Sequence, residues 1–132
     1  MAMKMNLLLC PVNDLAAAIA FYRDTLGWPV KFRDGDRYCA IDAGGLTLGL
    51  AAQEERIVEE PAPVLRVDDI EQNLAVMIAA GASIARPLEQ GPHEVRAVLR
   101  APGGGTLVLS ASRPPGIGNP EKRANGSQPG LP

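Results

Sequence analysis

The sequence contains few of the residues that build cross-links or metal centres. It has two cysteines, Cys10 and Cys39, and one histidine among its 132 residues. Two isolated cysteines provide neither a disulfide framework nor the spacing of metal ligands. We therefore expect two buried, reduced thiols in a cytoplasmic protein.

Long apolar runs and an excess of one charge are also missing. The longest apolar run is far shorter than the roughly 20 residues that span a membrane, and the formal net charge is −2. The N-terminal stretch MAMKMNLLLCPVND lacks a small-residue cleavage site, so it predicts a strand instead of a signal peptide. With 46% apolar and 21% charged residues, the composition is that of an ordinary globular domain and predicts neither a membrane nor a nucleic-acid partner.

The sequence does contain an internal repeat. The stretch VNDLAAAIAFYRDTLGWPV (12–30) aligns with VDDIEQNLAVMIAAGASI (67–84), and GGLTLGL (44–50) aligns with GGGTLVL (103–109). Helix starts, glycine stops and strand ends recur in the same order in both copies. Such an internal repeat indicates the architecture directly, and it predicts a duplicated module.

Each copy has the pattern of one strand, one helix and three further strands. Asp14 and Asp69 precede stretches of helical apolar periodicity and predict helix N-caps, while Gly27 and Gly81 predict the residues at which the helices end. Short apolar stretches between turn signals predict strands at 6–12, 29–33, 37–42 and 46–52, and again at 63–67, 83–86, 95–101 and 106–112. This order predicts an α+β fold with a curved, mostly antiparallel sheet.

Changes in composition suggest how the chain is divided. We expect one domain over 1–112, made of module one at 5–52, a linker at 53–62 and module two at 63–112. The four glutamates of the linker favour a solvated connection over an acidic substrate clamp. Residues 113–132 hold five prolines and four glycines, and we expect a tail that cannot fold alone.

The residues of the first helix carry a family resemblance. The stretch VNDLAAAIAFYRDTLGW (12–28) resembles the opening helix of the vicinal oxygen chelate superfamily, which includes glyoxalases, extradiol dioxygenases, fosfomycin-resistance enzymes and bleomycin-resistance proteins. VLRVDDIEQNLAVMIAAGASI (64–84) and LRAPGGGTLVLS (99–110) are similar to the matching parts of the second module. The resemblance implies two tandem βαβββ modules that form a cup-shaped mixed sheet, with helices outside and a ligand cleft within, commonly in a homodimer.

The resemblance also implies where metal ligands would lie. Members that do metal chemistry carry a His or Glu seven residues before the Asp of each module and a Glu on its last strand. In this sequence those positions are Leu7 and Ala62, and Gly49 and Val108. None of them can bind a metal ion, and a slip of two residues brings in only Glu60 as a plausible ligand. The chain resembles a member without the usual metal ligands, and we expect no metal or other cofactor.

Alternation along the strands separates an apolar face from a face that carries polar groups. The apolar face, expected under the helices, holds Cys39, Ile41, Val95, Ala97 and Leu99. The opposite, concave face holds Tyr38 and Arg96, and Arg66 falls on the same side.

Five residues are therefore candidates for ligand binding. Tyr38, Arg66 and Arg96 are expected on the concave face, where guanidinium groups suit carboxylate or phosphate, unless the arginines reach the rim and meet water or Asp and Glu side chains. Trp28 follows the helix stop and is either a wall of the cleft or part of a subunit interface. His93 lies in a loop away from every metal position, where it either contacts a ligand, for example as a base near neutral pH, or stays solvent-exposed.

Two functions follow from these residues. The first is a metal-free small-molecule-binding protein that resembles bleomycin-resistance proteins and sequesters a partly planar, anionic ligand in the cleft of a dimer. The alternative is an enzyme of the same superfamily, a lyase or oxidoreductase with a non-standard or metal-free active site. In it, His93 or an arginine–tyrosine pair would supply the acid–base or electrophilic groups. A superfamily scaffold alone does not choose between them.

Overall fold

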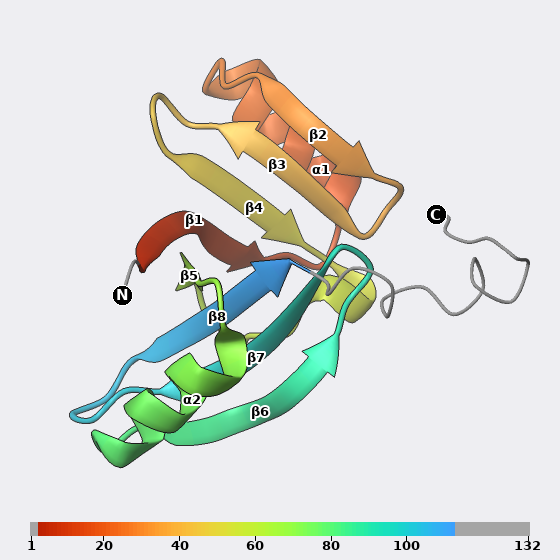
Figure 1. Ribbon diagram of the computed structural model, residues 1–132. Coiled ribbons are helices and arrows are strands. Elements are labelled where there is room, and N and C mark those ends of the chain that lie inside the picture. Colours follow the sequence, from red (N-terminus) through yellow and green to blue (C-terminus); the bar gives the residue numbers. More distant parts are fainter. Residues whose placement is uncertain (1–2, 113–132) are drawn as a thin grey trace, which may run out of the picture.

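The computed structural model describes residues 3–112 (Figure 1), so the predicted tail at 113–132 lies outside the described residues. The order of elements is the predicted βαβββ, twice over. The elements are β1 (Lys4–Pro11), α1 (Leu15–Ala20), η1 (Phe21–Thr25), β2 (Val30–Asp34), β3 (Tyr38–Asp42), β4 (Thr47–Ala51), η2 (Gln53–Glu55), β5 (Ala62–Arg66), α2 (Ile70–Ala79), β6 (Ser83–Gln90), β7 (Glu94–Arg100) and β8 (Thr106–Ser112).

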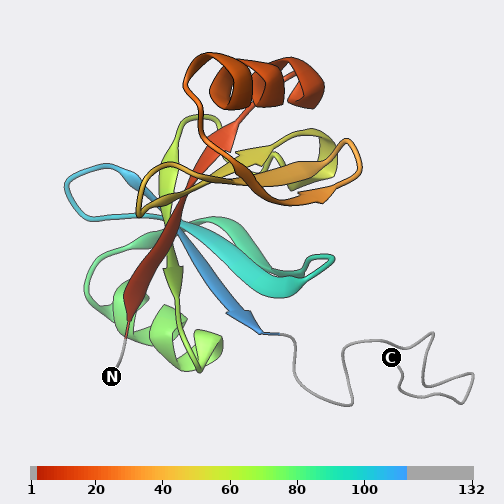
Figure 2. The ribbon, with the colours of Figure 1, turned by 90° about the horizontal axis from the view of Figure 1, so that it is seen from above.

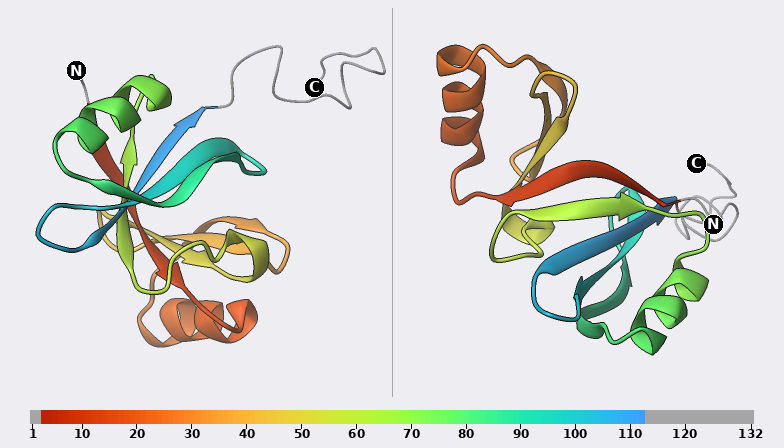
Figure 3. Two further views of the ribbon diagram at one scale, coloured as in Figure 1. Left: turned by 90° about the horizontal axis from the view of Figure 1, so that it is seen from below. Right: turned by 90° about the vertical axis from the view of Figure 1, so that its left-hand side faces the viewer.

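All strands join one curved, mixed sheet of eight strands in the order β2-β3-β4-β1-β5-β8-β7-β6. β1 and β5 pair antiparallel at its centre, and each pairs in parallel with the last strand of its own module, β4 or β8. The views in Figures 2 and 3 agree that α1 and α2 lie on the outer sides of the molecule, with the strands between them. The predicted fold class is confirmed.

The predicted helix starts are confirmed, whereas the first helix is not a uniform α-helix. The Asp14 carboxylate accepts a hydrogen bond from the Ala17 N–H at 3.0 Å, and that of Asp69 accepts one from the Gln72 N–H at 3.1 Å. After Ala20 the helix widens into the π-helical segment η1. The wider turn ends with Gly27 at φ 76°.

Apolar residues form layers on both faces of the sheet, whereas alternation predicted one apolar face and one face that carries polar groups. Cys39 and Ile41 pack with Leu15 and Ile19 of α1. The corresponding cluster of module two joins α2 to the apolar face of β7 and β8, with Ile70, Leu74, Ala97, Leu99 and Leu109 among its members. A third cluster, between the modules on the concave face, includes Leu9, Ala51, Ala62, Val64, Val98 and Val108. No helix within residues 3–112 is long and apolar enough to cross a membrane.

Two departures from the predicted element boundaries matter for the site. β6 extends to Gln90, four residues beyond the expected end, and this brings Glu89 opposite Arg96 on β7. The stretch expected to be a solvated linker instead begins with the short helix η2, entered through Gln53 at φ 53°. Its last residue, Glu55, is buried with 7% of its surface exposed. The interpretation of all four linker glutamates as solvated was wrong for Glu55.

Candidate functional site

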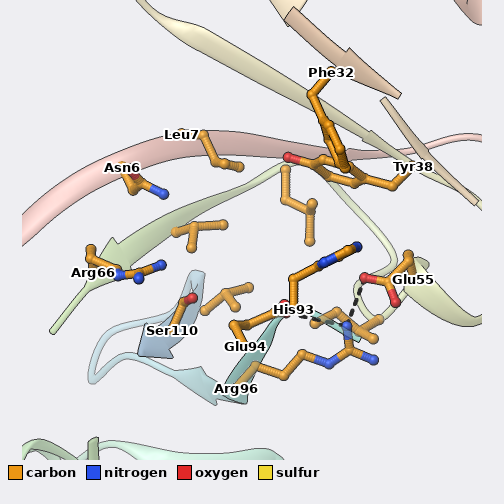
Figure 4. A pocket seen from close by; sticks show the side chains of 14 residues that line it. Asn6, Leu7, Phe32, Tyr38, Glu55, Arg66, His93, Glu94, Arg96 and Ser110 are labelled. Carbon is orange, nitrogen blue, oxygen red and sulfur yellow. Dashed lines mark hydrogen bonds and ion pairs between the residues drawn. The ribbon is translucent and has the colours of Figure 1, made fainter. Parts of the chain in front are cut away.

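A cavity of about 190 Å³ opens on the concave face between the two modules (Figure 4). Strands of both modules and the helix η2 contribute to its walls. The lining residues are Asn6, Leu7, Leu9, Phe32, Tyr38, Glu55, Ile57, Val64, Arg66, His93, Glu94, Arg96, Val108 and Ser110. Four of the five predicted ligand-binding residues are thus brought together, from positions that are up to 58 residues apart in the sequence (96 minus 38).

Two of the four positions at which the resemblance implies metal ligands lie on this cavity, and the other two flank one of its lining residues. Leu7 and Val108 line it, and Leu9 pairs with Gly49 on one neighbouring strand and with Ala62 on the other. Hydrocarbon side chains and a glycine offer no electron pair to a metal ion, so these residues do not fit one. Within residues 3–112, no three His, Cys, Asp or Glu side chains cluster as metal ligands would. Glu60 lies along a separate groove with Arg86 and Arg100.

Tyr38 occupies the space that a longer side chain at Gly49 would need. A Cβ atom added to Gly49 would lie 2.7 Å from the Tyr38 hydroxyl oxygen and 3.0 Å from Cδ1 of Leu7. Burial raises the pKa of Tyr38 to about 12, so the phenol remains a neutral hydrogen-bond donor at neutral pH. In Figure 4 its hydroxyl points toward Leu7.

Aromatic side chains form one wall. The rings of Phe32 and Tyr38 are 6.4 Å apart and inclined by 48°. The His93 ring meets Phe32 edge to face at 5.7 Å, and its Nε2 lies 3.0 Å from Oδ2 of Asp34. Sequence spacing separates His93 from the metal positions, but the structure places it on the same cavity as Leu7.

Arg96 lies at the centre of a buried ion cluster. Its Nη1 donates to Glu55 Oε1 at 2.8 Å and to Glu94 Oε2 at 3.4 Å, while its Nε donates to Glu89 Oε2 at 3.0 Å. Its Nη2 donates to the carbonyl oxygen of Glu54 at 3.4 Å. All three guanidinium nitrogens are therefore engaged within the protein, although Arg96 does lie on the concave face as alternation predicts.

Glu55 is one of the site residues that sequence reasoning missed. Its Oε2 is buried without a hydrogen-bond partner among residues 3–112. Burial raises its pKa, which the Arg96 guanidinium opposes. The only signal in the sequence is that Glu55 belongs to an acidic stretch next to the end of a strand, and exposed linkers share this feature.

The remaining two predicted residues differ in their surroundings. Arg66 lines the cavity with Asn6 and Ser110 and donates a hydrogen bond to Ser112 Oγ at 2.6 Å. It forms no ion pair with any carboxylate among residues 3–112. Trp28 does not line this cavity; it stacks on Tyr22 at 5.8 Å and packs against the core under α1.

The chain is similar to known proteins over most of its length. Residues 4–109 match the model of the Glyoxalase/Bleomycin resistance protein/Dioxygenase superfamily. An uncharacterized protein of Mycolicibacterium smegmatis is 30% identical over 107 residues, which are 80% of this chain and 91% of that protein.

Solved structures share the fold at lower sequence identity. An NAD-dependent benzaldehyde dehydrogenase structure from Legionella pneumophila aligns with TM-score 0.69 and 21% identity, over 81% of this chain and 98% of that one. A glyoxalase/bleomycin resistance protein/dioxygenase superfamily member from Vibrio splendidus aligns with TM-score 0.59 and 19% identity, over 84% and 98% of the two chains. At these identities the likeness concerns the fold alone.

Proposed function

The chain belongs to the glyoxalase/bleomycin resistance protein/dioxygenase superfamily, and on this premise we propose that it binds a small molecule without a metal ion. The bound molecule is partly planar, carries an anionic group and is sequestered in the cavity between the two modules. In this respect the protein acts as bleomycin-resistance proteins do and serves resistance to a toxic compound.

One observation carries the proposal. The four positions of the superfamily's metal ligands lie together, but they are occupied by Leu7, Gly49, Ala62 and Val108. Metal catalysis needs several ligands that converge on one ion and leave an open position for the substrate. A cavity with an apolar floor and a few convergent polar groups instead has the character of a ligand pocket.

The lining supports the proposed ligand features. The inclined rings of Phe32 and Tyr38 offer faces for a planar group. Arg66, without a carboxylate partner in the described part of the chain, is suited to an anionic group. The neutral Tyr38 phenol can donate a hydrogen bond to a ligand oxygen.

The proposal includes a cytoplasmic homodimer. The exposed apolar side chains Phe21 and Leu26, 52% and 43% accessible, support a contact between subunits on the surface of module one. Trp28 follows them in the chain, so its second predicted role, at a subunit interface, stays a prediction.

Metal analysis and ligand titration test the proposal. Protein purified without chelator should contain far less than one equivalent of Zn, Ni, Mn or Fe. Small aromatic acids should raise the unfolding temperature of the wild type, because ligands of the native state stabilise it, and should do so less in Arg66→Gln. A stoichiometric metal bound by cavity residues would contradict the proposal.

One observation favours an enzyme as the second candidate. The His93–Asp34 pair, with Nε2 3.0 Å from Oδ2, orients an imidazole at the cavity as a general base requires. In this case Nδ1 of His93 would accept a proton from the substrate. Turnover that His93→Asn abolishes while ligand binding persists would establish this alternative.

A further inference from the structure

Building on the proposed function, we propose that the ligand is amphoteric, with an ammonium or similar cationic group held by Glu55, Tyr38 and Phe32. Its anionic group lies at the opposite end of the cavity, near Arg66. Figure 4 shows the two ends apart, with Arg66, Asn6 and Ser110 at one and Glu55, His93 and Arg96 at the other.

The end of the cavity at which Arg96 lies carries an excess of negative charge. Three carboxylates, Glu55, Glu89 and Glu94, surround this one guanidinium. Arg86 compensates Glu89 from the other side at 2.9 Å. One negative charge still remains in excess, and every nitrogen of Arg96 already donates to a protein oxygen. An anionic group here would meet like charges.

The Glu55 carboxylate can accept a further hydrogen bond. This side chain is more than nine-tenths buried, it lines the cavity, and its Oε2 has no hydrogen-bond partner in the described part of the chain. Buried carboxylate oxygens are ordinarily paired. Rotation about the terminal carboxylate torsion is soft, so Glu55 can keep Arg96 on one oxygen and present the other to a ligand. A cationic N–H group supplies both the missing donor and the missing charge.

The aromatic wall of the cavity can also attract a cation. Ring faces attract cations through the negative charge of the π-system, and the attraction grows when water is excluded. Tyr38 and Phe32 are inclined at 48°, so together they offer two faces to one group. Glu55, Tyr38 and Phe32 line the same cavity, and a carboxylate with two rings suits a cation, whereas Arg66 at the far end suits an anion.

Three probes of nearly equal shape separate the charges. These are 4-(aminomethyl)benzoate, 4-methylbenzoate, which lacks the ammonium group, and 4-methylbenzylamine, which lacks the carboxylate. Titrations of the full chain, followed by ¹H–¹⁵N NMR, report which residues respond and the dissociation constants. We expect the amphoteric probe to bind about tenfold more tightly than 4-methylbenzoate, because a hydrogen bond to a charged group is gained.

Variants then assign the two ends. Glu55→Gln should weaken the binding of the amphoteric probe and of the amine about tenfold and leave the binding of 4-methylbenzoate unchanged. Arg66→Gln should weaken the binding of the two probes that carry a carboxylate and leave the binding of the amine unchanged. Glu54→Gln is the matched control, because this neighbouring glutamate pairs with Arg37 at the surface and should alter none of the three. If Glu55→Gln does not fold, Glu94→Gln and the probe order in the wild type decide the question.

The outcomes distinguish the two proposals. If 4-methylbenzoate binds in the cavity as tightly as the amphoteric probe, and Glu55→Gln changes neither, the cation site is refuted while the proposed function stands. If no probe perturbs cavity residues at millimolar concentration, or binding requires an added divalent metal, the proposed function falls as well.

Discussion

Replacement of Arg96 by methionine tests whether this guanidinium serves the protein's own carboxylates. Arg96 is 5% exposed and Glu55 7%, and their nitrogen and oxygen are 2.8 Å apart. Methionine keeps most of the side-chain length, so the cavity left behind is small. The main effect is a buried Glu55 carboxylate without a counter-charge, whereas Glu89 keeps Arg86 and Glu94 contributes only a 3.4 Å contact.

The expected cost is that of a broken buried ion pair, about 3–5 kcal/mol in the free energy of unfolding. In a domain of this size such a loss lowers the melting temperature by roughly 10–20 °C. Urea unfolding followed by far-UV circular dichroism should show a lower midpoint with an unchanged slope. Arg23→Met is the control, since its ion pair with Asp24 is exposed and its loss should leave the midpoint almost unchanged.

Two further measurements separate charge from packing. The double variant Arg96→Met/Glu55→Gln should regain much of the lost stability, because the stranded charge is gone. The difference in the free energy of unfolding between wild type and Arg96→Met should narrow as the pH falls. Burial already raises the pKa of Glu55, and removal of Arg96 raises this pKa further, so a falling pH neutralises the stranded carboxylate in the variant. A loss below about 1 kcal/mol, in the range of exposed pairs, or a gap that is independent of pH, would refute the charge argument.

Three other perturbations probe the packing and the ends of elements. Gly49→Ala should cost about 1–3 kcal/mol by overpacking, because its Cβ would lie 2.7 Å from the Tyr38 hydroxyl; in a Tyr38→Phe background the measured cost by urea unfolding should be smaller. Asp69→Ala should lower the free energy of unfolding by about 0.5–2 kcal/mol through loss of the cap of α2, whereas Asp69→Asn should retain most of it. Arg37, and then His93, hold the pKa of Asp34 below its usual value, so this carboxylate stabilises the fold above its ordinary pKa. Asp34→Asn should lower the urea midpoint at neutral pH, and the difference should vanish only in strongly acidic solution as the pH falls through the lowered pKa; a difference that persists there would show a role other than charge.

Local features of the chain predicted the fold well. Asp14 and Asp69 cap helices, and Cys39 and Ile41 face α1, because caps and alternation depend only on residues a few positions apart. The family resemblance implied the metal-ligand positions, seven residues before Asp14 and Asp69 and on the last strand of each module, and two of them, Leu7 and Val108, line the cavity. The π-helical end of the first helix could not be foreseen, since apolar periodicity does not distinguish it from an α-helical end.

The partners of the polar groups in the site depend on contacts between residues that are far apart in the sequence. Alternation assigned Arg96 to the concave face, but its principal partner, Glu55, lies 41 residues away in a helical turn of the linker. Asp34 and His93, 59 residues apart, meet in the same way, across the two modules. The Tyr22–Trp28 stack in turn directs the one tryptophan into the first module instead of the cavity.

By itself, then, the sequence determined the duplicated module, the faces of the strands and the apolar character of the four metal positions. The tertiary structure alone decided that Arg96 is neutralised within the protein and that Glu55 and His93 belong to the cavity. The reason is physical: periodicity and capping are properties of adjacent residues. The pairing of buried charges instead depends on where the linker crosses the curved sheet and on how β6 pairs with β7.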